Sequence, residues 1–166
     1  LGVGSKGVIT KKMWYDTMTA WLLHRAEQKH NIIVTVPSTP AQYFHVLRRQ
    51  IHRPYAKPLI VMSAKWMLHH AICVSELNAM CTGTHFQRVI SEGKNNKGDN
   101  TTWRMKEPLL PDEQIERLIF CSGQIYYHLF NMRQALGIKN VTFVRIEQLA
   151  PFPYDIIGPA ALSRFP

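Results

Sequence analysis

Histidine is the residue type in this chain that most readily suggests chemistry, because eight imidazoles could bind a metal ion. His69 and His70 are adjacent, so they would point in different directions on a helix, whereas His45 and His52 are seven residues apart and could share one face. Neither pair has a cysteine or a carboxylate at ligand spacing. The pattern favours scattered surface or capping histidines, and we expect no metal ligands and no catalytic residue.

Motifs for nucleophilic catalysis or phosphate binding do not stand out either. The sequence has no G-x-S-x-G, P-loop or H-E-x-x-H pattern. Ser122-Gly123 is predicted at a strand-to-helix turn, where backbone N–H groups could meet an anion. Such turns are common in α/β proteins, so the turn alone does not identify a site.

Positive charge is concentrated near the start of the chain. The net charge is +9, and residues 1–70 hold ten Lys/Arg against two acids. This balance speaks about partners such as nucleic acid, anionic lipid or an acidic protein, although a solvated face is the plainer explanation. Arginine favours bidentate contacts with phosphate or carboxylate, and tryptophan can stack on bases. The predicted phosphate, RNA or partner contacts are Lys6, Lys11, Lys12, Arg48, Arg49, Arg53 and Trp66.

Two ordinary roles compete with that prediction. The arginines could form salt bridges between domains or simply be solvated, and the tryptophans could pack in a core or an interface. Three cysteines without CxxC spacing fit a reducing compartment. No apolar run approaches the roughly 20 residues that a membrane helix needs, and no signal peptide is visible. A cleaved organelle-targeting segment would explain the missing initiator methionine.

Helical and strand patterns alternate along the chain. Apolar residues recur at helical spacing over 11–30, and the β-branched run at 31–36 predicts a buried strand. Thr39 is the expected N-cap of the next helix, with Pro40 at its first position and Gln42 three residues after the cap. Its expected apolar stripe is Tyr43, Phe44, Leu47 and Ile51, and Pro54 ends the helix.

The second half continues the alternation. We predict a buried strand over 57–63, a helix over 64–70, and a surface excursion over 92–113 that is rich in Gly, Asn, Pro and charge. A strand ending at Gly123, a helix capped by Gly137, a strand over 140–146, a Pro-rich loop and a last helix follow. Such alternation predicts an α/β fold with parallel sheet.

Five ordered segments resemble one known family. They are "AEQKHNIIVTVPSTPAQYFHVLRRQ", "KPLIVMSAKWMLHH", "GTHFQRVI", "RLIFCSGQIYYHL" and "VRIEQLAPFPYD". The chain resembles the thiamine-diphosphate-dependent decarboxylating component of 2-oxoglutarate dehydrogenase. The resemblance implies partial three-layer parallel-sheet lobes of the transketolase type. Residues 1–54 would be a remnant of the pyrimidine-binding domain, and residues 55–166 a truncated C-terminal domain.

Departures from the family pattern suggest a degenerate copy. The family holds the diphosphate, Mg²⁺ and the activating carboxylate in earlier parts of its chain, and Met13 stands where the family carries an active-site histidine. Methionine cannot transfer protons as imidazole does. Trp66 replaces a small serine, which suggests a new contact surface, and His128 replaces an acid. We therefore expect no bound cofactor, with thiamine diphosphate and Mg²⁺ relevant only to an active dehydrogenase.

Three functions remain open on this basis. The first is a non-catalytic subunit of a large assembly in the mitochondrial matrix, either a ribosome with rRNA and protein partners or a respiratory-chain or ATP-synthase complex, without a membrane span. The alternative is a fragment or split chain of an active 2-oxoglutarate dehydrogenase. A third is an acyl-CoA or nucleotide sensor, for which no ligand residues can be named.

Overall fold

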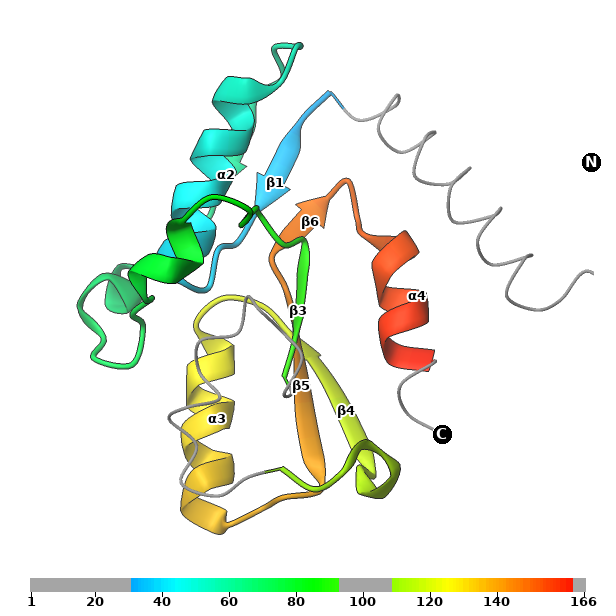
Figure 1. Cartoon of the computed structure of the whole chain (residues 1–166). Coiled ribbons are helices and arrows are strands. Elements are labelled where there is room, and N and C mark those ends of the chain that lie inside the picture. Colours follow the sequence, from blue (N-terminus) through cyan, green and yellow to red (C-terminus); the bar gives the residue numbers. More distant parts are fainter. Residues whose placement is uncertain (1–30, 93–108, 163–166) are drawn as a thin grey trace, which may run out of the picture.

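The computed structural model describes residues 31–92 and 109–162. Within these ranges the strands form two three-stranded sheets, in the orders β2-β1-β6 and β3-β5-β4, which lie one beyond the other with helices beside them (Figure 1). The α/β class predicted from the sequence is confirmed, although each sheet contains one parallel and one antiparallel pair. The helix predicted over 11–30 lies outside the described residues.

The first sheet is built around β1 (Ile33–Thr35), which the β-branched run predicted. β1 pairs in parallel with β2 (Leu59–Val61) and antiparallel with β6 (Gln148–Ala150). β2 is an edge strand with Ile60 45% exposed, so its predicted burial is wrong. β6 falls in the stretch predicted as a Pro-rich loop, because three residues before a proline give no periodic signal.

Helix α2 (Pro40–His52) begins as predicted. The Thr39 hydroxyl accepts a hydrogen bond from the Gln42 amide at 3.3 Å, and Pro40 occupies the first turn. The Gln42 side chain does not return to the cap as a capping box would require. Its amide oxygen accepts instead from the Gln87 backbone N–H at 3.0 Å, which ties α2 to the segment before β3 (Val89–Ser91).

The buried face of α2 differs from the predicted one. Tyr43, Phe44 and Leu47 are each 42% exposed, and Ile51 is more exposed still. The buried residues are Ala41, Gln42, His45 and Val46. The periodicity identified a helix correctly but chose the wrong face, because the polar residues on the buried face find hydrogen-bond partners in other segments.

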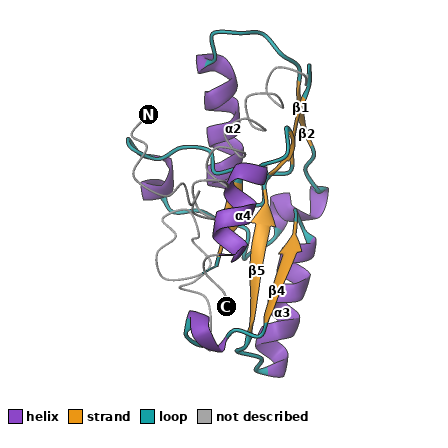
Figure 2. Ribbon diagram, turned by 90° about the vertical axis from the view of Figure 1, so that its right-hand side faces the viewer, coloured by secondary structure: helices purple, strands orange, loops and turns teal. Residues whose placement is uncertain are grey.

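The second sheet has β5 (Val141–Ile146) at its centre. β5 is parallel to β4 (Arg117–Cys121) and antiparallel to β3. Helices α3 (Ile125–Leu136) and α4 (Tyr154–Leu162) lie on opposite sides of this sheet, giving three layers (Figures 1 and 2). Four consecutive residues of β5 are therefore buried, as expected of a strand covered on both faces.

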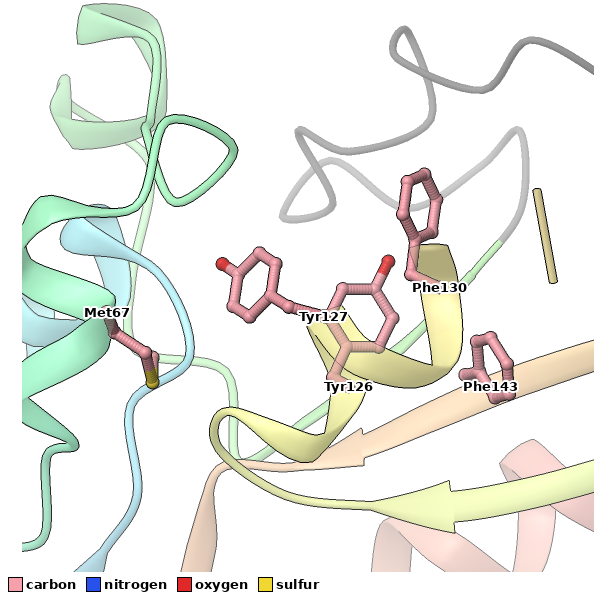
Figure 3. Packing of buried hydrophobic residues seen from close by; sticks show 5 residues of the cluster. All are labelled: Met67, Tyr126, Tyr127, Phe130 and Phe143. Carbon is pink, nitrogen blue, oxygen red and sulfur yellow. The ribbon is translucent and has the colours of Figure 1, made fainter. Parts of the chain in front are cut away.

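An aromatic cluster joins α3 to β5 and to the segment after β2. Tyr126, Tyr127 and Phe130 project from α3 and gather with Phe143 of β5, and Met67 completes the cluster (Figure 3). Met67 belongs to η1 (Lys65–His69), a 3₁₀ turn where the sequence predicted a helix. Further 3₁₀ turns are η2 (Leu77–Met80) and η4 (Asp112–Gln114). The core therefore spans both halves of the chain.

Two glycines with positive φ allow a matched test of packing. Gly137 ends α3 at φ +65°, with open space around its Cα, whereas a Cβ on Gly123 (φ +59°) would lie 2.9 Å from Cγ1 of Val36. Gly137→Ala is expected to cost about 1 kcal/mol of unfolding free energy from backbone strain. Gly123→Ala adds a clash, so a total cost of about 2–4 kcal/mol is expected. Urea unfolding of the two variants checks this, and equal costs would contradict the packing of Gly123 against Val36.

Candidate functional site

A buried polar cluster lies where the chain passes from one sheet to the other. Glu147 is the single residue between β5 and β6, and it is fully buried. Its backbone N–H donates to the Arg88 carbonyl, and its carbonyl accepts from the Val36 N–H at 2.8 Å. Glu147 therefore stands at the junction of the two sheets.

The Glu147 carboxylate accepts hydrogen bonds from the loop between β1 and α2. Its Oε2 accepts from the Ser38 N–H at 2.7 Å, and its Oε1 accepts from the Ser38 hydroxyl. The Arg145 guanidinium donates to the same hydroxyl at 3.1 Å. We call Ser38, Arg145 and Glu147 the Ser38 cluster. All three residues are fully buried, so a substrate cannot reach the Ser38 hydroxyl. The cluster therefore has a structural role, in which its hydrogen bonds hold the Ser38 loop against β5 and the residue after it.

Helix α3 also contacts the Ser38 loop, through Tyr127. Its hydroxyl donates to the Ser38 carbonyl at 2.5 Å, and the Cys73 thiol lies 3.5 Å from the same oxygen. Burial raises the pKa of Tyr127 far above its ordinary value, so the phenol remains a hydrogen-bond donor at every physiological pH. The loop at Ser38 is thereby connected to β5, to the residue that joins β5 to β6, and to α3.

A second buried ionic group lies against the aromatic cluster. Both Glu92 oxygens accept from Arg133, at 2.6 and 3.0 Å, and they also accept from the Tyr126 hydroxyl at 2.9 Å and the Phe143 N–H at 3.0 Å. We call Glu92, Arg133 and Tyr126 the Glu92 cluster. The sequence placed Glu92 in a surface excursion, which is wrong, because its partners are 34 or more residues away and leave no local pattern.

The three arginines predicted as contact residues lie on or next to α2 and are partly buried. Arg48 donates to the Thr84 carbonyl. Arg49 donates to the Gln148 side chain at 2.8 Å and lies 4.2 Å above the Phe86 ring. Arg53 lies 5.3 Å from the Tyr55 ring. Arg48 and Arg49 therefore connect α2 to other parts of the same chain by hydrogen bonds to neutral oxygens rather than by the salt bridges considered from the sequence.

The remaining predicted contacts divide into two groups. Lys6, Lys11 and Lys12 lie outside the described residues, as does Met13. Trp66 is 38% exposed, and its ring lies 3.8 Å from the His70 ring and 5.1 Å from the His128 ring, centroid to centroid. The rings of Trp66 and His128, the two positions predicted from the sequence to depart from the family pattern, are therefore in contact.

The described residues do not gather several metal-ligating side chains at one place. No three His, Cys, Asp or Glu side chains within 31–92 and 109–162 gather closely enough to hold a metal. The buried carboxylates Glu92 and Glu147 both accept hydrogen bonds from donors of the chain itself. His45 is buried with its Nε2 2.7 Å from the Ala79 carbonyl. No helix in the described ranges is long and apolar enough to cross a membrane.

Cysteine reactivity should follow this burial. Burial raises the pKa of Cys121 to about 12 and also raises that of Cys73, whereas Cys81 is exposed. Because only the thiolate is alkylated, we expect iodoacetamide at pH 8 to modify Cys81 in the folded chain and to leave Cys121 intact until denaturant is added. Peptide mass spectrometry measures this, with Cys81→Ser as the control. Rapid labelling of Cys121 in the folded chain would contradict its packing.

Comparison with known proteins identifies the family. The model of the 2-oxoglutarate dehydrogenase C-terminal family matches residues 74–166. A probable 2-oxoadipate dehydrogenase complex component E1 homolog of Dictyostelium discoideum is 45% identical over 130 residues, which is 78% of this chain and 13% of the relative.

Two further relatives agree. A mitochondrial 2-oxoglutarate dehydrogenase-like protein of Rattus norvegicus is 44% identical over 76% of this chain and 12% of its own length. The 2-oxoglutarate dehydrogenase E1 component of Brucella anthropi is 40% identical over 87% of this chain and 14% of its own length. The chain thus spans about an eighth of the length of these relatives.

These relatives correct the leading functional prediction. A ribosomal or respiratory accessory subunit is wrong, because the similar proteins are named as dehydrogenase E1 components rather than as ribosomal or RNA-binding proteins. The alternative of a dehydrogenase fragment agrees with them better. The resemblance read from the five segments is confirmed, and the chain belongs to the 2-oxoglutarate dehydrogenase C-terminal family.

Proposed function

We propose that this chain is the C-terminal portion of an E1 component that oxidatively decarboxylates 2-oxoglutarate or 2-oxoadipate. The observation that carries the proposal is the 45% identity to a 2-oxoadipate dehydrogenase E1 homolog over 78% of the chain. Similar identity to 2-oxoglutarate dehydrogenase-like proteins leaves both acids as candidates. They differ by one methylene, which a site can discriminate by only about 1–3 kcal/mol.

The portion contributes structure rather than reacting groups. The two buried carboxylates of the described residues belong to the Ser38 and Glu92 clusters, and no three His, Cys, Asp or Glu side chains gather within these ranges, which supports this division. We propose that the cofactor is held by other parts of a longer E1 protein. In this proposal, the residues of this chain fix the relative position of the two sheets, and the cofactor-binding parts of the E1 protein pack against these sheets.

The cellular compartment, the domain division and the partners of the chain are also part of this proposal. The names of several relatives include the word mitochondrial, and we propose the mitochondrial matrix as the compartment. A division into a pyrimidine-binding-type part up to residue 54 and a transketolase-type part from residue 55 stays a prediction. The contact residues at Lys6, Lys11, Lys12, Arg48, Arg49, Arg53 and Trp66 stay predictions for protein partners within the dehydrogenase complex.

An exchange experiment tests the proposal. Residues 31–166 replace the aligned stretch of the Dictyostelium relative, and CO₂ release is measured with each of the two acids. We expect a folded chimera with activity toward at least one acid within about tenfold of the relative, since tenfold corresponds to only about 1.4 kcal/mol in the barrier. A folded chimera that releases no CO₂ from either acid would overturn the proposal.

A further inference from the structure

Trp66, His70 and His128 form a small aromatic group at the surface, which we call the His–Trp cluster. Trp66 lies in η1, His70 caps its C-terminal end, and His128 projects from α3. The indole lies 3.8 Å from the His70 ring at 33°, and it is stacked at 5.1 Å on the His128 ring at 25°. The cluster thus bridges the segment after β2 and helix α3. The proposed function uses only Trp66 of it, as a predicted partner contact, and gives no role to the two histidines.

The His70 side chain forms a hydrogen bond with the turn that follows it, and this bond depends on the protonation state of the imidazole. Its Nδ1 accepts a hydrogen bond from the Ile72 N–H at 3.3 Å. Only an imidazole without a proton on Nδ1 can accept, so this contact requires neutral His70 protonated on Nε2. Protonation would place a second N–H opposite the Ile72 N–H and break the bond.

The turn at 71–75 is attached to the segment that starts α2. The Cys73 thiol lies 3.5 Å from the Ser38 carbonyl, and the Ser75 hydroxyl accepts from the Ala41 N–H at 3.0 Å. Ala41 is in the first turn of α2, where backbone N–H groups have no partner within the helix. Release of the turn would therefore weaken a cap on α2 and a contact of the Ser38 cluster.

The groups that face His70 do not favour its positive charge. Lys65 and His69 lie on the same segment as His70, and both are exposed. Helix α3 contributes His128 and Tyr127, whose ring centroid is 5.7 Å from that of His70. Within the described ranges neither imidazole of the cluster forms an ion pair with a carboxylate. Burial lowers the pKa of His70, and the nearby His128 lowers it further.

We propose that the His–Trp cluster is a pH-sensitive joint, in which protonation of His70 releases the turn at 71–75 from its side chain and loosens the start of α2. The sign follows from linkage. Because the pKa of His70 is lower in the folded chain than its unfolded value of about 6.5, the unfolded chain binds more protons below that pH. The stability that neutral His70 contributes is complete above about pH 6.5 and is lost as the pH falls.

The experiment follows the full 166-residue chain by NMR between pH 7.5 and 5. In the wild type, we expect the amide signals of Ile72, Ser75 and Ala41 to move together with the His70 ring signals, at a midpoint below about 6.5. His128→Gln removes the repelling charge, so the midpoint is expected to rise. His70→Gln keeps an acceptor that does not titrate, and it is expected to abolish the transition at Ile72.

His69→Gln is the matched control, since this neighbouring imidazole is exposed, and it should leave the midpoint unchanged. Three results would each overturn the proposal. They are a His70 midpoint above the unfolded value, an Ile72 signal that stays still while His70 titrates, and a transition that persists in His70→Gln. The first two of these results are read from the wild-type titration, so the proposal can be tested even if a variant folds poorly.

Discussion

Arg133→Met is expected to lower the free energy of unfolding by about 3–5 kcal/mol, because it strands a buried carboxylate without its countercharge. Glu92 is fully buried, and Arg133 supplies two of the donors to its oxygens, at 2.6 and 3.0 Å. The methionine keeps the length and much of the apolar stem of arginine, so lost packing adds little. Urea unfolding followed by circular dichroism measures the change.

The Arg88–Asp155 pair provides the matched control. Its side chains are 23% and 19% exposed, against 2% and 0% for the Arg133–Glu92 pair, so water still reaches the charges. Arg88→Met is expected to cost about 0–1 kcal/mol. The double variant Arg133→Met with Glu92→Leu should recover part of the loss, because it removes both charges. Equal costs for the two arginine variants would show that the Glu92 cluster does not hold the core together.

Glu147→Leu is the second change with a large expected effect, again about 3–5 kcal/mol of unfolding free energy. The leucine cannot accept from the Ser38 N–H or hydroxyl, both of which are buried with the carboxylate. Since Glu147 is the residue between β5 and β6, the loss should be felt in both sheets. Hydrogen exchange can test this at one amide, that of Ser38.

In the wild type, the Ser38 N–H should exchange as slowly as the core of β5, although Ser38 lies outside any strand or helix. In Glu147→Leu it should exchange at the rate of an open loop. Glu147→Gln is the conservative control, because it retains one acceptor oxygen, and a smaller loss is expected. Fast exchange of the Ser38 amide in the wild type would be incompatible with the Ser38 cluster.

Elements with strong local signals were predictable from the sequence. Thr39 and Pro40 mark the start of α2, and Gly137 marks the end of α3 at φ +65°. These signals work because a cap or a left-handed glycine acts within a few residues of where it stands. The β-branched runs at β1 and β5 likewise identified strands, since both are covered by other elements.

Elements that depend on distant partners were not predictable. β6 has three residues and exists because β1 lies beside it, more than a hundred residues earlier in the chain. The candidate site has the same origin, for Ser38 and Glu147 are 109 residues apart. Nothing near Glu92 in the sequence distinguishes a buried carboxylate from a solvated one, because burial is decided by the fold as a whole.

The net charge of +9 misdirected the functional prediction. A charge count does not show where the charges go, and the described structure turns Arg48 and Arg49 towards carbonyl and amide oxygens of the same chain. The quoted segments were the better guide. They contain Ser38, Tyr127 and Arg145, and the side chains of Tyr127 and Arg145 both donate hydrogen bonds to Ser38 near the junction of the two sheets.

The rate of CO₂ release by the chimera, divided by that of the intact Dictyostelium protein, tests most directly whether these residues are a working portion of an E1 component. A ratio above about 0.1 with 2-oxoadipate or 2-oxoglutarate is predicted, because the transplanted residues supply support and leave the reacting groups to the rest of the protein. A chimera that unfolds cooperatively at the temperature of the parent, yet gives no CO₂ above background with either acid, would contradict the account.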